Sequence, residues 1–249
     1  MIDIRCGDAY EMINTIPDHS VDLVLTDPPY ELTQEKNRKM QGKYSPINSR
    51  MKKSYHELEW ISTGIKKEFV EDLLFRVCKT PNAFFFCSKK QLSKYLEIAE
   101  RHSVPYDILV WCKSNAIPSC NFTLKPDIEY IFFYHKGRAI TGSANNKTHY
   151  FVQPIVQKEK TLYGHPTIKP LNIVKNLVIV GSSAGDTVLD PFMGSGTTGV
   201  ACKELGRNFI GYEMIDKWYN VAKSRIETAE KDNTLFESVN DNGSELSLF

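Results

Sequence analysis

Short apolar runs that alternate with helical patterns constrain this sequence more than any other feature. Seven runs have the length and composition of β-strands: 2–4, 21–26, 83–87, 108–113, 130–135, 187–190 and 209–213. Several of these runs are apolar almost throughout, which is typical of strands covered on both faces. Five helical patterns lie between or after them, at 68–79, 91–101, 171–180, 197–205 and 217–230. The alternation predicts an α/β fold with a doubly wound, mostly parallel sheet.

The length and composition favour one soluble domain. A chain of 249 residues is long enough for one α/β domain with insertions, and we expect residues 1–229 to form it. No apolar run reaches the roughly 18 residues of a membrane span, and the first residues lack the pattern of a secretion signal, so we expect a cytoplasmic protein. The six cysteines form no CxxC pair, and we expect them to be buried thiols rather than metal ligands or disulfides.

Three segments depart from the alternation. Residues 31–60 are predicted to form a basic loop, since 31–56 contains seven Lys or Arg against two acids. Residues 136–165 are rich in turn formers, and the wider segment 116–160 is our candidate for target recognition. Residues 230–249 contain five acids and one lysine and are expected to be a flexible tail. A basic loop on a nearly neutral body indicates a local contact with a polyanion.

The first motif with chemical meaning is Asp27-Pro28-Pro29-Tyr30, directly after the apolar run 21–26. In open α/β sheets, ligands bind beyond the carboxyl ends of the strands. An exocyclic amine of a nucleobase is a poor nucleophile, and two acceptors, the Asp27 carboxylate and the Pro28 carbonyl, can hold both of its hydrogens. The Tyr30 ring can stack on a base turned out of a helix. The motif therefore favours methyl transfer to an amine, although Asp-Pro and Pro-Pro also occur in ordinary turns.

The second motif is Asp-Pro-Phe-Met-Gly-Ser-Gly-Thr-Thr-Gly at 190–199, between the run 187–190 and a helical pattern. Its glycines let the backbone turn sharply and approach a ligand, and the helix that follows can receive a carboxylate. Glu213 ends the next strand, where it can accept from ribose hydroxyls. The same glycines match the GxGxxG pattern of nicotinamide enzymes, which leaves an oxidoreductase as an alternative. No phosphate-binding Gly-Lys-Ser/Thr follows.

Together the two motifs resemble those of the amino-methylating (N6-adenine/N4-cytosine) DNA methyltransferases. The catalytic motif precedes the cofactor motif, and this permuted order is similar to the beta class. Three further motifs agree with that family: Cys-Gly-Asp-Ala at 6–9, Trp-Cys-Lys-Ser-Asn at 111–115 and His-Pro-Thr-Ile-Lys-Pro at 165–170. The resemblance covers residues 2–225, and five ordered motifs make it specific.

The resemblance implies a Rossmann-like methyltransferase fold, with a seven-stranded, mostly parallel sheet that has one antiparallel strand. It implies S-adenosylmethionine (SAM) as cofactor, bound by Asp8, Thr167, Lys169, Asp190, Phe192, Gly194, Gly196, Thr197 and Glu213. The catalytic residues would be Asp27, Pro28, Pro29 and Tyr30, and no metal is expected. The aspartate of the first motif favours adenine N6 as the target, after base flipping, because enzymes of the family that act on cytosine N4 usually have serine there.

Other functions stay open at this point. A cytosine-N4 methyltransferase and a non-catalytic, DNA-binding subunit are the main alternatives, and RNA or protein methylation would usually come with Asn-Pro-Pro-Tyr in the opposite motif order. The resemblance is also consistent with a restriction–modification system of a bacterium, archaeon or phage, and with a homodimer.

Contacts with double-stranded DNA are expected from the basic loop and from the recognition segment. The predicted DNA-binding residues are Lys36, Arg38, Lys39, Lys43, Arg50, Lys52, Lys53, Arg138, Asn145 and Lys147. The sequence ends in Glu-Leu-Ser-Leu-Phe, which is similar to the peptide that binds the bacterial sliding clamp. Leu246, Leu248 and Phe249 would make that contact, although glutamate stands where the peptide usually has glutamine.

Overall fold

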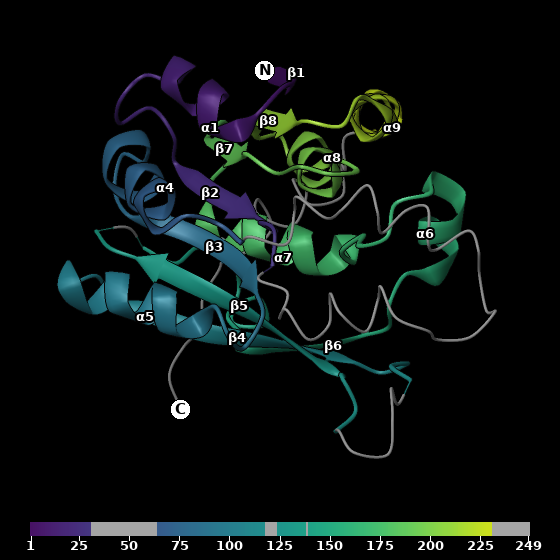
Figure 1. The fold of residues 1–249 in the computed structure, drawn as a ribbon, viewed down its shortest axis with the longest axis horizontal. Coiled ribbons are helices and arrows are strands. Elements are labelled where there is room, and N and C mark those ends of the chain that lie inside the picture. The colour runs from purple at the N-terminus through teal and green to yellow at the C-terminus, as the bar shows by residue number, and fades with distance from the viewer. Residues whose placement is uncertain (31–63, 118–123, 138, 231–249) are drawn as a thin grey trace, which may run out of the picture.

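The computed structural model of the protein describes residues 1–30, 64–117, 124–137 and 139–230 (Figure 1). The predicted basic loop, 31–60, lies outside these ranges, as does the predicted tail after residue 230. In the described residues, no helix is long and apolar enough to cross a membrane.

Eight strands of the described chain form a single sheet in the order β1-β8-β7-β2-β3-β5-β4-β6. The strands are β1 Ile2–Cys6, β2 Leu23–Thr26, β3 Asn82–Cys87, β4 Tyr106–Lys113, β5 Ile128–His135, β6 Tyr150–Gln153, β7 Thr187–Asp190 and β8 Asn208–Glu213. All seven predicted strands are present. The doubly wound α/β fold is therefore confirmed, with one more strand than expected.

The eighth strand, β6, corrects the predicted strand number. It lies within 136–165, which had been expected to be a loop, and pairs in parallel with β4 at the edge of the sheet. Only four residues long, it alternates between exposed and half-buried positions, with Tyr150 63% and Val152 59% exposed. An edge strand this short forms no apolar run, which explains why the sequence did not reveal it.

One strand, β5, runs antiparallel to its neighbours β3 and β4, as the prediction of a single reversed strand required. All other pairs in the sheet are parallel. The long β3–β5 ladder pairs Phe84 with Phe133, whose rings stack with centroids 3.9 Å apart. Because β5 is reversed, its first residues lie at the edge of the sheet where the parallel strands end.

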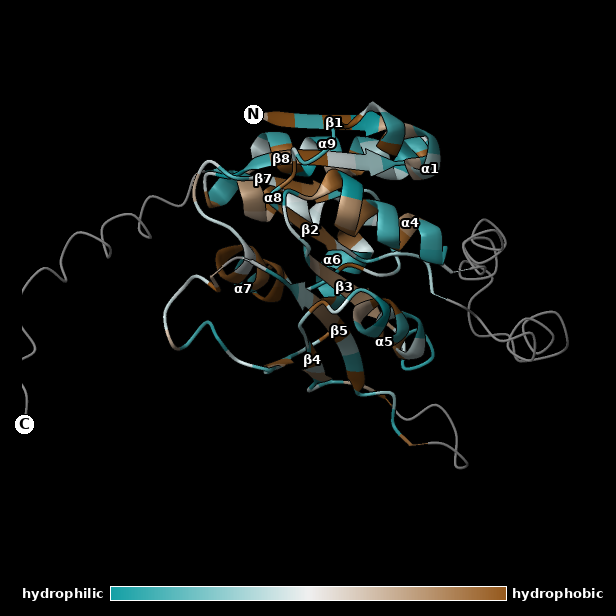
Figure 2. Cartoon of the chain, turned by 90° about the vertical axis from the view of Figure 1, so that its left-hand side faces the viewer, coloured by the Kyte–Doolittle hydropathy of each residue, from teal (hydrophilic) through white to brown (hydrophobic). Residues whose placement is uncertain are grey.

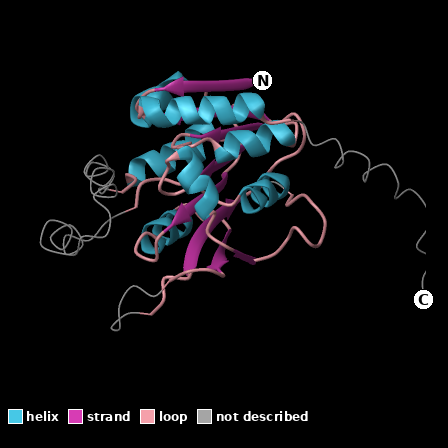
Figure 3. Cartoon of the chain, turned by 90° about the vertical axis from the view of Figure 1, so that its right-hand side faces the viewer, coloured by secondary structure: helices cyan, strands magenta, loops and turns pink. Residues whose placement is uncertain are grey.

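Helices cover both faces of the sheet (Figures 1 and 3). They are α1 Ala9–Met12, α4 Lys67–Asp72, α5 Leu92–Arg101, α6 Gln157–Tyr163, α7 Leu171–Gly181, α8 Thr197–Glu204 and α9 Asp216–Thr228. One core joins α1, α4 and α5 to one face, and a second joins α7, α8 and α9 to the other. In Figure 2, α7 is hydrophobic along most of its length, in agreement with its six buried residues. The five predicted helices are present within a few residues, whereas α1 and α6 were not predicted.

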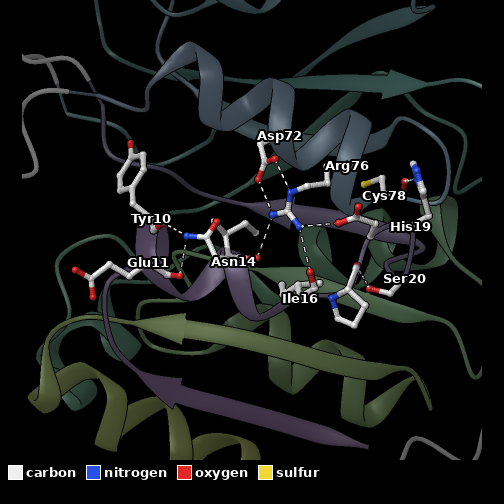
Figure 4. A network of polar contacts seen from close by, with 12 residues as sticks. Tyr10, Glu11, Asn14, Ile16, His19, Ser20, Asp72, Arg76 and Cys78 are labelled. Atoms are coloured by element: carbon white, nitrogen blue, oxygen red, sulfur yellow. Dashed lines mark hydrogen bonds and ion pairs between the residues drawn. The ribbon is translucent and has the colours of Figure 1, made fainter.

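The helix predicted at 68–79 changes its winding part-way. After α4 the chain continues as a π-helical turn, η3, at Leu73–Val77. Arg76 in this turn pairs with Asp72 at 2.6 Å and with Asp18 at 3.2 Å, and it donates to the carbonyls of Ile13 and Ile16, both at 3.1 Å (Figure 4). The guanidinium thereby ties the segment that precedes β2 to the helix beside it. It helps to set where β2 begins, and so where its carboxyl end delivers the first motif.

Candidate active site

The two sequence motifs meet because β2 and β7 are neighbours in the sheet. Thr26, the last residue of β2, donates from Oγ1 to Oδ1 of Asp190, the last residue of β7, at 2.7 Å. Residues 27–30 and 191–198 therefore leave the sheet side by side, although 164 positions separate Thr26 from Asp190. This edge is where open parallel sheets bind their ligands.

A cavity of about 370 Å³ lies at this edge. All four predicted catalytic residues line it, together with Thr167, Lys169, Phe192, Gly194 and Glu213 from the predicted cofactor set. The remaining lining residues are Trp111, Lys113, Glu129, Ile155, Lys160, His165, Pro166, Ile168 and Trp218. One cavity thus joins the end of β2 to the end of β8, where the resemblance had suggested target and cofactor sites.

Asp190 and Thr197 line a smaller adjoining cavity of about 40 Å³. Asp190 is buried and accepts from Thr26 and Thr198, both at 2.7 Å, and from the Phe192 amide at 3.2 Å. Burial raises the pKa of Asp190 to about 7, against the opposing effect of these donors. In this arrangement Asp190 holds the glycine loop onto the sheet, and its oxygens are already engaged by the protein.

The glycines of the loop have different neighbours. Gly194 has φ +52°, and a Cβ there would lie 3.0 Å from Nε2 of His165, so it lets the 165–170 segment pack onto the loop. Gly196 has φ +79°, and a Cβ there would lie 2.8 Å from Cβ of Ala222 on α9. Gly194 lines both cavities, whereas Gly196 lines neither. The second glycine therefore serves the packing of α9 in the described structure.

Asp8 follows β1 and Glu213 ends the neighbouring strand β8, but the two residues differ in their access to the cavity. Glu213 lines the cavity and accepts from the Ile215 amide at 2.8 Å, and burial raises its pKa. Asp8 caps α1 by accepting from the Tyr10 amide at 2.9 Å. It is not among the residues that line the cavity. The structure thus gives Asp8 a capping role and leaves its predicted cofactor contact as a prediction.

Four charged side chains and one hydroxyl form a cluster on the cavity wall. Lys169 Nζ lies 2.5 Å from Asp27 Oδ2 and 2.8 Å from Glu129 Oε1. Glu129 Oε2 in turn lies 2.8 Å from Lys113 Nζ, and Glu129 Oε1 accepts from the Tyr30 hydroxyl at 3.0 Å. Lys169, which was predicted to bind the cofactor, lines the cavity and pairs with Asp27, which was predicted to be catalytic. We call these five residues the charge cluster.

In the charge cluster, burial disfavours the ionised form of each side chain, whereas attraction between opposite charges favours it. Burial raises the pKa of Asp27, with Lys169 opposing this effect. Burial alone would also raise the pKa of Glu129, but Lys169 and Lys113 outweigh it and lower that pKa to about 2. For Lys169, burial disfavours the charge, yet Asp27 and Glu129 together raise its pKa. Glu129 and Lys169 are therefore ionised at neutral pH.

Comparison with known proteins decides the family of this chain. The family model for N6/N4 DNA methylases matches residues 21–224, which is most of the sequence. The chain belongs to the DNA methylase family. The predicted resemblance is thereby confirmed, and the protein is a DNA methyltransferase of the N6/N4 type.

Relatives and solved structures of this DNA methylase agree with that assignment. It is 27% identical over 248 residues to the type II methyltransferase M.HinfI of Haemophilus influenzae, covering 88% of this chain and 67% of that protein. It is 26% identical over 244 residues to the type II methyltransferase M2.MboI of Moraxella bovis, covering 90% and 86%. The crystal structure of an M1.HpyAVI–SAM complex matches with a TM-score of 0.64 at 26% identity, covering 91% of this chain and all of that one. The cytosine-N4-specific PvuII methyltransferase, at 14% identity and a TM-score of 0.68 over 96% of this chain and 91% of that one, shares the fold.

Gln91 anchors the Asp-Pro-Pro-Tyr segment, 27–30, of the methylase and was missed in the sequence. Its side chain is fully buried and donates from Nε2 to the Pro29 carbonyl at 3.1 Å. Its Oε1 accepts from the amide and the hydroxyl of Ser88, both at 3.0 Å. The Pro29 carbonyl is therefore occupied by the protein. A polar residue at the start of a helical pattern would usually be assigned to capping, so nothing in the sequence pointed to this contact.

The Trp-Cys-Lys-Ser-Asn motif of the methylase has two functions in the structure. Trp111 donates to the Gln153 carbonyl at 2.8 Å, and Asn115 exchanges two hydrogen bonds with the backbone of Ile155. Between them, Lys113 points to Glu129. The outer residues thus hold the segment after β6, while the lysine belongs to the charge cluster. Glu129 itself was overlooked, although an acid that alternates with Ile131 and Phe133 on the buried face of a strand is an unusual pattern.

A third missed residue, Arg225 of α9, connects the glycine loop to α6. The Arg225 side chain is 7% exposed, and its guanidinium donates to the Ser195 carbonyl at 2.7 Å and to Thr197 Oγ1 at 3.2 Å. It also lies 4.5 Å from the ring centre of Tyr163 and 3.5 Å from Glu159, both on α6. The same helix contributes Lys160 to the cavity wall. Arg225 therefore fixes the loop and the helix that border the cavity.

Two of the predicted DNA-binding residues lie in the described part of the chain, and the others lie outside it. Asn145 and Lys147 are exposed in the turn before β6. This turn is tied to α7 through Asn146 and Asn176, whose side chains are 2.8 Å apart, and it does not line the cavity. The other predicted contacts lie outside the described residues, as do the clamp-binding residues: Lys36, Arg38, Lys39, Lys43, Arg50, Lys52, Lys53, Arg138, Leu246, Leu248 and Phe249.

Proposed function

We propose that this DNA methylase transfers a methyl group from SAM to the exocyclic N6 of adenine in double-stranded DNA, on a base turned out of the helix. The observation that carries the proposal is the Asp-Pro-Pro-Tyr segment, 27–30, on the wall of a cavity that also includes Gly194 and Glu213. The same cavity is therefore lined both by acceptors for an amine and by the residues that we expect to bind the methyl donor.

The amine would be held by two acceptors. Oδ1 of Asp27 is buried and accepts no hydrogen bond from the described residues. A buried carboxylate oxygen without a donor is unfavourable, and an amino hydrogen of the target base would satisfy it. The second acceptor would be the Pro28 carbonyl, because the Pro29 carbonyl already accepts from Gln91. Two such acceptors draw the nitrogen lone pair out of conjugation with the ring and align it for transfer.

We expect SAM to occupy the part of the cavity near Gly194 and Glu213. The whole cavity, including the wall at Asp27, has a volume of about 370 Å³, which lies within the usual range for ligand sites. The Glu213 carboxylate would accept from the ribose hydroxyls, and Phe192, Gly194 and Thr167 would contact the rest of the molecule. When bound, SAM supplies a methyl group activated by a positively charged sulfur. It is the methyl donor of this family.

The mostly buried position of Asp27 favours a target base that is turned out of the DNA helix. The Asp27 side chain is only 23% exposed, and an adenine stacked within a duplex would not bring its amine to such a site. The Tyr30 ring is held in place by its hydroxyl, which donates to Glu129. A ring with a fixed orientation beside the acceptor suits stacking on an extruded base.

The first test is tritiated methyl transfer from SAM to unmethylated genomic DNA, followed by mass spectrometry of the nucleosides. Label in N6-methyladenine is expected. N4-methylcytosine would instead make the enzyme cytosine-specific, and an absence of label on DNA, with SAM bound, would favour a non-catalytic subunit.

The role of Asp27 is tested by Asp27→Ala. We expect methyl transfer to fall by at least about 10²-fold while SAM affinity stays within about tenfold, since the carboxylate acts on the target amine. Asp107→Asn on β4, which changes a carboxylate far from the cavity, is the control. Wild-type turnover by Asp27→Ala would overturn the proposed role.

A further inference from the structure

Glu129 is the central residue of the charge cluster, yet the proposed reaction does not use it directly. Its side chain is 11% exposed and meets three partners, the ammonium groups of Lys169 and Lys113 and the hydroxyl of Tyr30. A carboxylate with so little access to water is retained at low cost only when its partners are well placed. Its position between the two lysines therefore calls for a functional explanation.

Lys169 makes the two carboxylate oxygens of Asp27 unequal, because its ammonium group contacts only one of them. The ammonium group lies 2.5 Å from Oδ2 of Asp27 and 2.8 Å from Glu129, and the Lys169 side chain is 9% exposed. Among the described residues, no hydrogen bond reaches Oδ1 of Asp27. Glu129 holds the same ammonium group through a second contact, so that Lys169 engages one aspartate oxygen and leaves the other for the target amine.

Charge balance gives Glu129 a second function. After methyl transfer the target nitrogen is cationic and must lose a proton. The N–H bond breaks, its electron pair stays on nitrogen, and the proton bonds to Oδ1 of Asp27, which becomes a neutral acid. Lys169 then loses one of its two counter-ions while it stays buried. Glu129 remains ionised, because its lysine partners lower its pKa to about 2, and it keeps Lys169 paired.

We propose that Glu129 is a positioning residue for methyl transfer. Together with Lys169 it orients Asp27 toward the target amine, and it serves as the counter-ion of Lys169 when Asp27 takes up the proton. This inference rests on the proposed function, in which Asp27 binds the amine.

The inference predicts a change in pH dependence. Burial is the main cause of the raised pKa of Asp27, and the negative charge of Glu129 raises that pKa further. Replacing the Glu129 carboxylate by an amide should therefore lower the pKa of Asp27 and make it a weaker base. The titratable groups that lie against these two carboxylates, or act on them electrostatically, are Tyr30, Cys87, Lys113, Lys160, Lys169 and Asp190. All of them remain in the variant.

The experiment measures single-turnover methyl transfer by Glu129→Gln from about pH 5 to 9. We expect the maximal rate to fall at least about tenfold and the acidic limb of the profile to move to lower pH. S-adenosylhomocysteine (SAH) affinity, measured by calorimetry, should change less than threefold, or about 0.7 kcal/mol. Asp107→Asn is the matched control. Asp107 pairs with His135 at 3.0 Å and His149 at 3.3 Å, away from the cavity, so its profile should match the wild type.

A double-mutant cycle with Lys169→Met separates positioning from a merely structural role. If Glu129 acts through Lys169, Glu129→Gln should slow the Lys169→Met protein far less than it slows the wild type. Additive losses with an unshifted pH profile would overturn the inference. Should Glu129→Gln fail to fold, Glu129→Asp keeps the charge on a shorter arm. It should then show a reduced rate with a wild-type profile, and a wild-type rate would again overturn the inference.

The outcomes distinguish this inference from the proposed function. If the wild-type enzyme labels cytosine, adenine specificity is refuted. The argument on Glu129 stays intact, because the methylated amine of either base must release a proton. Wild-type labelling of adenine, together with an unchanged rate and profile in Glu129→Gln, would refute the argument on Glu129 alone.

Discussion

Replacing Gly196 by alanine tests whether the second glycine of the loop serves the cofactor or the packing of α9. The residue has φ +79°, and an added Cβ would lie 2.8 Å from Cβ and 3.0 Å from Cα of Ala222. Gly185 is a matched control, because it has φ +84° and nothing lies within 4 Å of an added Cβ. The two substitutions share the backbone conformation and differ in the steric clash.

The expected magnitudes follow from these two geometries. A left-handed conformation costs an alanine about 1–2 kcal/mol, and both variants incur this cost. At position 196 the methyl group also meets the backbone of α9, and such overpacking costs a further 1–3 kcal/mol or so. Since each kcal/mol lowers the Tm of a protein this large by about 2–4 °C, Gly196→Ala should melt about 2–12 °C below Gly185→Ala.

Thermal unfolding of both variants and SAH affinity at 25 °C form the assay. We expect the folded Gly196→Ala protein to bind SAH within about threefold of the wild type, because Gly196 does not line the cavity. Equal Tm losses in the two variants would refute the packing argument. A wild-type Tm with lost affinity would instead show that the loop needs this glycine to approach its ligand.

Three further predictions address other contacts. Gln91→Leu releases the Pro29 carbonyl and should slow single-turnover methyl transfer by about 10²-fold, whereas an unchanged rate in the folded variant would contradict the anchoring role. Arg76→Met should lower the free energy of unfolding in urea by about 1–3 kcal/mol without affecting SAH binding, because its bonds to Asp72 and to two carbonyls are lost; a smaller loss would mean that water replaces them. Burial raises the pKa of Asp190 to about 7, so the folded protein holds a proton that the unfolded chain releases above about pH 4, and stability should fall as pH rises between these values. Asp190→Asn should flatten this fall in thermal melts, and parallel curves for the two proteins would contradict the assignment.

The features that the sequence predicted well are those encoded locally. Most of the seven predicted strands are runs of largely apolar residues, and burial of the central strands on both faces of the sheet requires such runs. The Asp-Pro-Pro-Tyr segment could be assigned to the catalytic edge because it directly follows one of these strands. Its proximity to Asp190 followed from the general rule for parallel sheets, since both residues come at strand ends.

What the sequence did not reveal depends on contacts between distant residues. Glu129 belongs to the site because β5 is reversed, and no local pattern states the direction of a strand. Gly196 was predicted to bind the cofactor, which stays a prediction, whereas its close approach to Ala222 depends on the position of α9 and could not be read from the sequence. Arg225 resembles any charged residue on an amphipathic helix until its partners at Ser195 and Thr197 are known.

The reversed direction of β5 also bears on how specificity can be redesigned. Because β4 ends and β5 begins at the catalytic edge, the connection between Lys113 and Ile128 leaves and rejoins the sheet there. Exchanging residues 116–127 between related methylases, while Lys113, Asn115 and Glu129 are kept, would test whether this part of the predicted recognition segment sets target choice without a change in the chemistry.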